Sequence, residues 1–491
     1  MKTYTTKLFV GVALLASVFF LTGCDTDDLV GTEPFQSVSP EQAVEDFQTV
    51  EAIALSVYTR NQSFSLYGNT LILVPEVLAD NAISRSGATR WQTQANNNVR
   101  AHMAGVWNTA YAQINEANQV LAVLPEFEDD PDVDPNDITR VRGEMLFTRA
   151  MAYHNLAKVF GYEPGQEVDG FDTSVVIRTE PTTTVEEADD FRPRSSNTDV
   201  YNQIKDDLEE AIDDLGVSDR GNPLFANEAA ALALRARVAL YEGDWATAED
   251  FATQAMQATG ADLVDAENYA SVALADEDAG LVRSNISSVS SIYDSAPNPE
   301  SIFEVGVQDQ SESLGVNDAI PPYLLPEQWQ ANIPPEDFLA LYEEDDVRRL
   351  LYPFDDIDNG APYTIKYNQS EDQWTDHIPV IRYPELLLIR AEARAEQNDD
   401  PGAREDLNTL RDARGASEIT SSGGDLIDDI LTERRLELNF EGHRFFDLKR
   451  RGLDIRKPGD GSIPYTDFRV LSNLPSADVE LNPEIDQNPG Y

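Results

Sequence analysis

The sequence predicts an all-α fold: a scaffold of tetratricopeptide-like helix hairpins, a large irregular loop-rich region and a few short strands. Apolar residues recur at helical spacing along much of the chain, which is the primary signal for amphipathic helices. Several of these helices follow one another in pairs, as in helical repeat proteins. Long stretches rich in proline, glycine and aromatic residues separate the pairs, and such loops are usually functional or contain short strands. They cover residues 61–95, 161–197, 259–383 and 452–491.

The helices follow from this periodicity. In the stretch VWNTAYAQINEANQVLAVL, Val106, Ala110, Ile114, Ala117 and Leu121 lie on one stripe of a helix. The same pattern predicts helices over residues 40–59, 96–124, 137–160, 198–215, 227–241, 244–258, 384–397, 400–414 and 425–441.

Three pairs of these helices have the pattern of a hairpin. The segment NEAAALALRARVALYEGDWATAEDFATQAM predicts two helices joined at Gly243 and Asp244, with alanines that allow close helix contact. The segment YPELLLIRAEARAEQNDDPGAREDLNTLRDARG predicts a second hairpin, and a third pairs residues 137–160 with 198–215 across an insertion. Three or more such pairs can stack into a common core. Alternation in SIFEVGVQ, residues 301–308, predicts a strand.

The N-terminus has the features of a secretory signal that ends at the only cysteine. Lys2 and Lys7 precede an apolar run, residues 8–21. As a helix this run would be about 21 Å long, too short to span a membrane comfortably. It ends in LTGC, which resembles a bacterial lipobox and predicts cleavage before Cys24 and acylation of its thiol. The alternative is a core cysteine in a buried helix, which the acidic sequence that follows disfavours.

The single cysteine also bounds the chemistry and the organisation of the chain. It excludes an intrachain disulfide and a cysteine-based zinc site. The residues that follow it, DTDD, resemble the surface-export signal of Bacteroidota lipoproteins, and a solvated tether is the alternative. The predicted organisation is a signal peptide (1–23), a lipidated tether (24–40), an N-terminal helical region (41–260) and a C-terminal region (261–491), the last two packed as one globular unit.

The chain is strongly acidic, with 36 basic and 89 acidic residues and a formal net charge of −53. Only seven of the basic residues are lysines. Such a surface repels nucleic acid and anionic lipid. Two interpretations of the charge remain: adaptation of a secreted protein to salt, which screens self-repulsion, or attraction of a cationic ligand. A hydrophobic content of 41% is enough for a core and argues against general disorder.

No motif for catalysis or for a cofactor is apparent. The chain lacks a Walker loop, a dinucleotide-binding glycine fingerprint and a GxSxG elbow, and its four histidines show no HExxH pattern. Two acidic stretches, residues 129–137 and 355–360, alternate carboxylates as calcium loops do. The first has Pro135 where an EF-hand needs glycine, and the second is incomplete. Solvated acidic turns are the alternative to calcium, and no cofactor is predicted.

The segment TERRLELNFEGHRFFDLKRRG, residues 432–452, places charged residues among large apolar ones. Gly442 is expected to end one helix and to let the chain restart in another. The spacing predicts two i,i+3 ion pairs within a structural network, Arg434 with Glu437 and Arg444 with Asp447. Catalytic carboxylates are the alternative; paired charges are satisfied rather than poised for reaction. The charged signature comprises Glu433, Arg434, Glu437, Arg444 and Asp447.

This segment resembles the C-terminal signature of the SusD/RagB family of outer-membrane nutrient-binding lipoproteins. Four other segments resemble family patterns in the family's order: GEMLFTRAMAYHNLAKVFGYEP (143–164), RPRSSNTDVYNQIKDDLEEAIDDL (192–215), IPVIRYPELLLIRAEA (378–393) and AREDLNTLRDARG (403–415). Pro384 stands where the family often has alanine, and proline suits the first turn of a helix.

The resemblance implies an all-α fold with four tetratricopeptide-like helix pairs and a loop-rich region. It also implies an outer-membrane lipoprotein, anchored by lipid and facing the cell exterior. Its expected partner is a SusC-like TonB-dependent β-barrel transporter, to which the lipoprotein delivers nutrient oligomers. The implied activity is binding, not turnover, so an enzyme is not expected.

Sugar or peptide capture needs flat apolar rings beside convergent polar groups. Trp91 lies in the stretch DNAISRSGATRWQTQANNN, where polar donors surround one large ring, and the resemblance places family ligand sites in comparable loops. The predicted ligand-binding residues are Trp91, Asn81 and Arg90, with Tyr323 and Trp329 as a second wall and Trp374 in a further loop. The alternative for each ring is that it packs against its own loop.

The predicted function is therefore capture of a nutrient oligomer for a TonB-dependent importer. A glycan is expected because it is the family's commonest cargo, and a peptide is the alternative cargo. From other classes, a tetratricopeptide-like scaffold for envelope assembly is disfavoured by the long aromatic loops. A surface hydrolase is disfavoured because no nucleophile or acid pair can be named.

Overall fold

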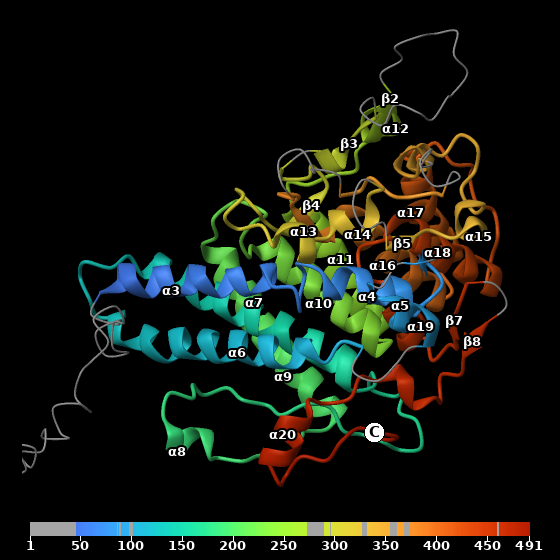
Figure 1. The fold of residues 1–491 in the computed structure, drawn as a ribbon. Helices are drawn as coiled ribbons and strands as arrows, with labels where there is room; N and C mark the ends of the chain where they lie inside the picture. Colours follow the sequence, from blue (N-terminus) through green and yellow to red (C-terminus); the bar gives the residue numbers. More distant parts are fainter. Residues whose placement is uncertain are drawn as a thin grey trace, which may run out of the picture. The chain divides into compact units, whose positions relative to one another are not determined.

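Helices form most of the described chain (Figure 1). The structure is a computed structural model that describes residues 46–85, 87, 90–97, 102–272, 289–294, 296–326, 331–353, 361–367, 374–458 and 461–491. It divides into two units, residues 1–50 and 51–491, and the arrangement below is that of the second unit.

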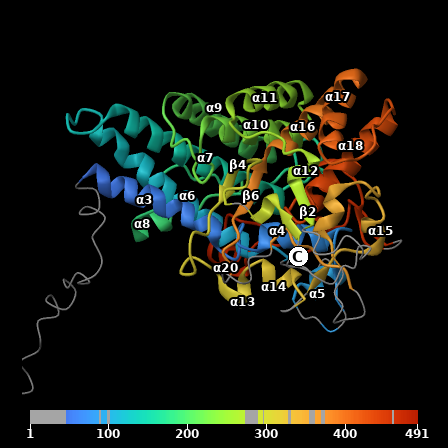
Figure 2. The same cartoon turned by 90° about the horizontal axis from the view of Figure 1, so that it is seen from above.

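Four helix pairs follow one another along residues 51–491. They are α3 (Phe47–Thr59) with α6 (Gly105–Val123), α7 (Pro135–Phe160) with α9 (Asn197–Val217), α10 (Glu228–Glu242) with α11 (Trp245–Ala258), and α16 (Tyr383–Glu396) with α17 (Asp400–Asp412). In the first pair, Gln113 Nε2 donates to the Val57 carbonyl, 3.3 Å away. Contacts of α6 with α7, of α9 with α10 and of α11 with α16 join successive pairs into one stack (Figure 2). The predicted hairpin scaffold is confirmed.

Local sequence signals set the ends of these helices. The side chains of Ser196, Asn227, Asp244 and Asp399 each accept a hydrogen bond from a backbone amide in the first turn of the helix that follows. Such caps satisfy amides that have no partner inside the helix. Gly243 ends α10 at φ 69°, in the left-handed region that favours glycine. Two residues, Gly243 and Asp244, therefore form the link between α10 and α11.

The short strands form two-stranded antiparallel pairs. The longest pair joins β4 (Ser301–Val305) to β6 (Ile378–Arg382), with irregular register near Phe303. The predicted strand over residues 301–308 is thus present but ends at Val305. The other pairs are β1 (Ile83–Ser84) with β5 (Asn332–Ile333), β2 (Ala270–Val272) with β3 (Val289–Ser291), and β7 (Ile455–Arg456) with β8 (Ser462–Ile463).

Three helices differ from the sequence prediction. The helix predicted over residues 96–124 is divided, because α5 (Gln92–Asn97) ends before α6 begins at Gly105. The helix predicted over residues 425–441 is α18 (Gly424–Glu437), which ends four residues early, and α19 (Arg444–Arg450) follows the turn at Gly442. Helix α4 (Thr70–Leu78) was not predicted: all nine of its residues are buried, so it has no polar face and no amphipathic period.

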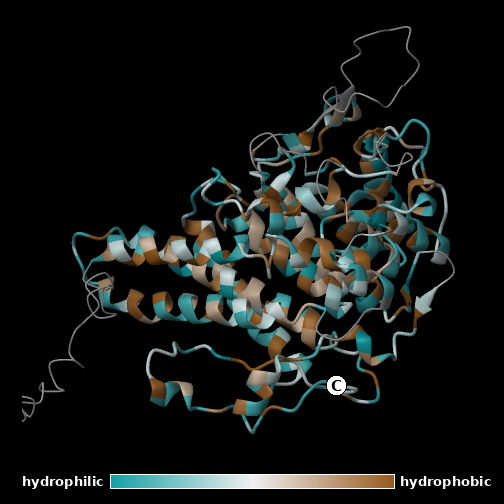
Figure 3. Cartoon of the chain, in the orientation of Figure 1, coloured by the Kyte–Doolittle hydropathy of each residue, from teal (hydrophilic) through white to brown (hydrophobic). Residues whose placement is uncertain are grey.

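The remaining described elements are single turns or short helices in the loop-rich region. The α-helical ones are α8 (Val185–Ala188), α12 (Ala266–Tyr269), α13 (Gly315–Asp318), α14 (Pro321–Leu324), α15 (Glu336–Leu339) and α20 (Ser476–Leu481). The 3-10 turns are η1 (Arg60–Gln62), η2 (Leu124–Phe127), η4 (Ile292–Asp294), η5 (Val347–Leu351) and η6 (Phe468–Val470). Figure 3 shows apolar residues along the facing sides of the stacked helices, which is where the core lies. Among the residues described, no helix combines the length and the apolar character needed to cross a membrane.

Buried ion pairs connect the predicted N-terminal and C-terminal regions. Arg237 on α10 donates from Nε to Glu385 Oε1 on α16 at 2.8 Å. Lys449 on α19 donates from Nζ to Glu163 Oε1 at 2.9 Å, and both side chains are 0% exposed. Helices α11 and α16 also pack across the predicted boundary. The two regions share one core, and the boundary at residue 260 itself stays a prediction.

Candidate ligand-binding site

Three aromatic rings from distant segments gather in the loop-rich region. The rings of Phe64 and Trp91 stack with centroids 5.7 Å apart and planes 18° apart. The rings of Trp91 and Tyr323 stack at 6.3 Å and 29°. Phe64 and Trp91 are partly exposed, whereas Tyr323 on α14 is 1% exposed. We call these three residues the ring cluster; Tyr323 forms its buried base, and Phe64 and Trp91 form its open part.

Hydrogen bonds fix the orientation of Trp91. Its backbone has φ 53°, an unusual value for a bulky residue, which places it at the turn before α5. The indole Nε1 donates to Asn69 Oδ1 at 3.1 Å, and Asn69 Nδ2 in turn donates to the Asp318 carbonyl at 2.9 Å. The ring is therefore held by Asn69, the residue before α4, which is itself hydrogen-bonded to α13. Backbone strain that is held in this way is typical of sites that position a side chain for function.

Arg90 connects the ring cluster to the α13–α14 segment. Its Nη1 donates to Tyr323 Oη at 2.7 Å and to the Asn317 carbonyl at 2.6 Å. The guanidinium also lies over the Tyr323 ring, 5.3 Å from the centroid. Burial raises the pKa of Tyr323, although Arg90 acts in the opposite direction, so the phenol is protonated at neutral pH. The structure thus brings Trp91, Arg90 and Tyr323 together, as the sequence suggested.

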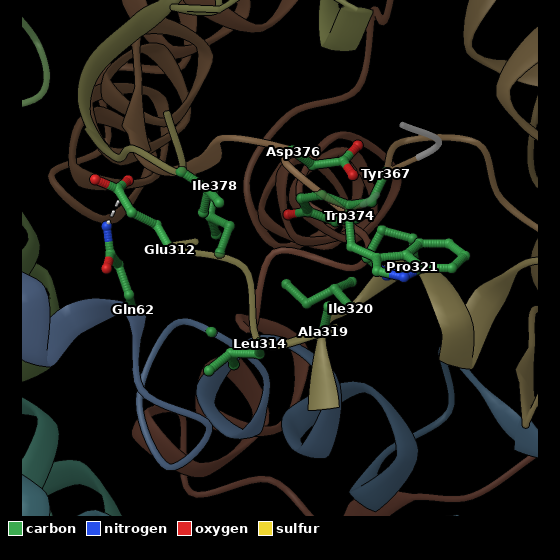
Figure 4. Close-up of a pocket in the computed structure, with 12 residues that line it drawn as sticks. Gln62, Glu312, Leu314, Ala319, Ile320, Pro321, Tyr367, Trp374, Asp376 and Ile378 are labelled. Carbon is green, nitrogen blue, oxygen red and sulfur yellow. Dashed lines mark hydrogen bonds between the residues drawn. The ribbon is translucent and has the colours of Figure 1, made fainter. Parts of the chain in front are cut away.

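Trp374 lines a small pocket beside the same α13–α14 segment (Figure 4). Leu314, Ile320 and Pro321 from this segment form its wall opposite Ile378. The pocket volume is about 20 Å³, which holds about one water molecule but not a sugar ring. Trp374 is partly exposed, with φ 70°. Any ligand here would lie across the surface rather than inside a cavity.

Asn81, one of the predicted ligand residues, has its hydrogen-bond partners away from the ring cluster. Asn81 is 1% exposed: its Nδ2 donates to Glu76 Oε2 at 2.7 Å, and its Oδ1 accepts from Arg435 Nε at 2.8 Å. This places Asn81 as a link between α4 and α18, away from the open rings. Asn81 is close to Trp91 in the sequence, but β1 lies between the two residues, and Asn81 does not join the open rings. Trp329 lies outside the described residues.

The C-terminal charged segment forms a buried network. Glu437 accepts hydrogen bonds from Arg348, Arg382 and Arg414 at 3.1, 3.0 and 3.0 Å. All four side chains are at most 1% exposed. Burial alone would raise the pKa of Glu437, but Arg414, Arg382 and Arg348 hold it well below its usual value. The carboxylate is paired on several sides, as a structural role requires.

The pairs predicted from i,i+3 spacing are wrong. Arg434 Nη2 lies 3.2 Å from Asp447 Oδ1, not beside Glu437. Arg444 Nε donates to Asp80 Oδ1 at 2.7 Å, not to Asp447. The turn between α18 and α19 folds the two helices together, so Arg434 pairs across the turn; the i,i+3 partner of Asp447 is Arg450, not Arg444. Glu433 likewise finds its partners outside the segment, at Arg348 (2.7 Å) and Arg411 (2.6 Å).

Gly442 makes that turn possible. Its φ is +83°, and a Cβ at this position would lie 2.0 Å from the Leu71 carbonyl oxygen. Its amide donates to Glu76 Oε1 at 3.0 Å. Burial raises the pKa of Glu76 to about 7 despite the amides that it accepts from. The turn therefore docks directly on α4, the helix that the sequence pattern did not reveal.

In the acidic stretch at residues 129–137, two carboxylates accept hydrogen bonds from nearby backbone amides. Asp130 Oδ1 accepts from the Asp132 amide, and Asp134 Oδ1 accepts from the Asn136 amide at the start of α7, both at 2.9 Å. Within the described ranges, no three histidine, cysteine or acidic side chains gather closely enough to hold a metal ion. Residues 355–360 and Cys24 lie outside those ranges. Burial lowers the pKa of both His102 and His443 to about 4, so both are neutral at pH 7.

Two family models match this chain. The model described as the SusD family matches residues 357–491, which contain the buried network and the turn at Gly442. The model described as starch-binding and associating with the outer membrane, SusD-like, matches residues 35–240, which contain Phe64 and Trp91. Over these two ranges the chain is similar to the SusD family.

Two SusD-like relatives are similar to this chain over nearly its whole length. The chain is 24% identical to SusD-like protein P38 of Formosa agariphila, over 97% of this chain and 98% of the relative. It is 25% identical to SusD-like protein P2 of the same organism, over 98% and 99%. A crystal structure of a SusD superfamily protein from Bacteroides vulgatus superposes with a TM-score of 0.76 at 23% identity, covering 90% of this chain and 99% of that one. The likeness confirms the fold.

The sequence pattern missed part of the ring cluster. Phe64 and Asn69 lie in a stretch predicted as loop, and nothing in their spacing points to Trp91. Asn317 lies more than two hundred residues away in the chain and meets Arg90 only in the folded structure. The one local signal for a ligand-binding residue was the composition of the loop, in which polar side chains surround a single large aromatic ring. That signal identifies Trp91 but not the residues that hold it.

Proposed function

We propose that this protein binds a glycan on the open part of the ring cluster and passes it to a TonB-dependent β-barrel. The observation that carries the proposal is the partly exposed pair of stacked rings, Phe64 and Trp91. Asn69 accepts a hydrogen bond from the Trp91 indole, and Arg90 donates to Tyr323, which stacks on Trp91. Flat apolar surfaces of this kind pack on the C–H faces of sugars, while nearby amides and guanidinium groups bond hydroxyls. Such binding needs no cofactor.

The pocket at Trp374 is too small to enclose a sugar ring, so the length of the ligand matters for how it could contact Trp374. Trp374 and the ring cluster both contact the α13–α14 segment, and Pro321 and Tyr323 belong to the same short helix. A single sugar would contact one of these two places. An oligosaccharide lying across the segment would contact both. The proposed ligand is therefore an oligomer, in keeping with the starch-binding description of the matched family model. A peptide remains the alternative cargo.

Trp91→Ala is expected to weaken oligosaccharide binding about thirtyfold, because a well-packed interface tryptophan contributes about 2 kcal/mol. The measurement is a thermal-shift and calorimetric panel of oligosaccharides and peptides against the folded protein in high salt. A ligand at about a hundred times its Kd adds about 2.7 kcal/mol of stability, which is visible as a higher Tm. Phe64→Ala is expected to act in the same direction.

The matched control is Phe191→Ala, since Phe191 is an aromatic residue 43% exposed in the α8–α9 loop, outside the ring cluster. It should leave affinity unchanged. A glycan that binds equally well to the wild type and to Trp91→Ala would place the site elsewhere. Binding of peptides alone would keep the importer role and change the cargo. No binding to either class would favour a scaffold role.

We also propose that Cys24 anchors the protein in the outer membrane, facing the exterior, through attached acyl chains. Support comes from the lipobox resemblance and from the outer-membrane description of the matched family model. In native cells the wild type is expected in the outer-membrane fraction, where it should co-purify with a TonB-dependent β-barrel. Cys24→Ala should leave it soluble, because one or more acyl chains supply the membrane affinity. A Cys24→Ala variant that stays membrane-bound would contradict the anchor.

A further inference from the structure

A second pocket, distant in sequence from the ring cluster, is lined by three arginines. Arg435 on α18, Arg444 on α19 and Arg456 on β7 all border it, and its volume is about 250 Å³. Figure 1 shows these three elements close together on one side of the helix stack. Its walls also include Leu431, Leu448 and Leu453. None of the residues that line this pocket belongs to the ring cluster or to the pocket at Trp374.

The positive charge at this pocket is incompletely neutralised. Asp80 is shared: Arg444 donates to both of its carboxylate oxygens, at 2.7 and 3.1 Å, and Arg435 Nη2 lies 3.2 Å from Oδ2. Asp428 lines the pocket, and it is exposed. Arg456 is exposed and makes no ion pair with any residue that the structure describes. Among the residues that line the pocket there are thus three guanidinium groups and one carboxylate, while Asp80 and Asp337 act on Arg435 from outside the lining.

This local excess of positive charge contrasts with the rest of the protein. The formal net charge is −53, and the buried arginines around Glu437 each meet at least two carboxylates. Burial lowers the pKa of Arg435 to about 10; Asp80 and Asp337 only partly offset this shift, and Arg444 and Arg456 add to it. An anion in the pocket would relieve this imbalance.

We propose that the arginine pocket, lined by Arg435, Arg444 and Arg456, binds an oxyanion: a sulfate or carboxylate group carried by a saccharide. Guanidinium groups present paired N–H donors that match carboxylate and sulfate oxygens, and such charge-assisted bonds are among the strongest in proteins. In the described part of the chain, Nη1 of Arg435 and Nη1 of Arg444 donate to no protein acceptor, so donors remain for a ligand. The leucines would contact the carbon skeleton. The site extends the proposed glycan binding to anionic sugars but stands on separate residues.

The test is calorimetric titration with four probes at constant ionic strength: sodium sulfate, glucose 6-sulfate, glucuronate and glucose. The charged probes are expected to bind and glucose is not. Arg456→Gln is expected to weaken binding of the charged probes about tenfold, since one charge-assisted hydrogen bond is lost. Its Tm should not change, because the Arg456 side chain has no hydrogen-bond or ion-pair partner among the described residues. Arg192→Gln is the matched control: Arg192 is 43% exposed, pairs with Asp190 and should not affect binding.

The outcomes separate the sources of the anion. Equal affinity for free sulfate and glucose 6-sulfate means that the pocket recognises the anion alone, whereas tighter binding of the sugar means that the leucines contribute. Both support an oxyanion site. No binding by any charged probe overturns the proposal. So does binding that survives both Arg456→Gln and the charge-reversing Arg456→Glu. Trp91→Ala should leave these affinities unchanged, so the ring cluster and the arginine pocket can fail independently.

Discussion

Replacing Glu437 with alanine is expected to lower the free energy of unfolding by about 3–5 kcal/mol, which is the usual loss when one partner of a buried ion pair is removed. Three arginines with side chains at most 1% exposed donate to this carboxylate. Without it, Arg348, Arg382 and Arg414 would retain fewer negative partners in a site from which water is excluded. Uncompensated buried charge is among the most costly defects in a fold.

The measurement is urea unfolding of the wild type and of Glu437→Ala at one fixed salt concentration. Glu480→Ala is the control, because Glu480 is exposed and its replacement should change the unfolding free energy by less than about 0.5 kcal/mol. A Glu437→Ala variant that unfolds like the wild type but no longer binds glycan would mean that this carboxylate belongs to a ligand site. It would then no longer count as part of a structural network.

Gly442→Ala is expected to have an even larger effect and to prevent folding or to cost more than about 4 kcal/mol. Two penalties combine. A left-handed backbone costs an L-residue about 1–2 kcal/mol, and the new Cβ would lie 2.0 Å from the Leu71 carbonyl oxygen, so α4 or the turn must move. The amide of Gly442 also donates a hydrogen bond to Glu76. A shift of the turn would therefore remove a hydrogen bond from this buried carboxyl group.

Gly165→Ala separates these two penalties. Gly165 has the same φ, +83°, but nothing lies within 4 Å of the position of its Cβ. This variant should lose only about 1–2 kcal/mol, the conformational cost alone. Melting temperatures and soluble yields of the two variants provide the comparison. Equal losses for Gly165→Ala and Gly442→Ala would show that the contact with Leu71 relaxes at little cost and that the turn does not depend on close approach.

Local periodicity was enough to predict three of the four helix pairs, because one helix of each, α9, α11 and α17, has an apolar and a polar face. It failed for α4, which is buried on all sides and so shows no contrast between faces. It failed again for the ion pairs of Arg434 and Arg444, whose partners are chosen by the fold of the α18–α19 turn. Spacing along one helix cannot report such partners.

The candidate ligand-binding site was predicted only in part, because local sequence signals do not show which distant segments meet there. Trp91 and Arg90 are marked by a large ring and a guanidinium in a polar loop, and the structure places them together with Tyr323. Composition could not show that Tyr323 is buried under Trp91 or that Asn81 turns inward toward α18. Those facts depend on which segments lie above and below the loop. The arginine pocket was not predicted at all, because its three arginines come from three different elements.

The buried pairs Arg237–Glu385 and Lys449–Glu163 bear on how such a chain can change over evolutionary time. Each pair has one member before residue 260 and one after it, and none of the four side chains is more than 5% exposed. Each half therefore supplies counter-charges to the other. A chimera that joins the first half of this protein to the second half of a relative keeps two buried charges, Glu163 and Arg237, whose partners must then come from the other parent. Exchange between family members is consequently easiest in the exposed loops, where ligand preference can vary while both halves of each pair stay together.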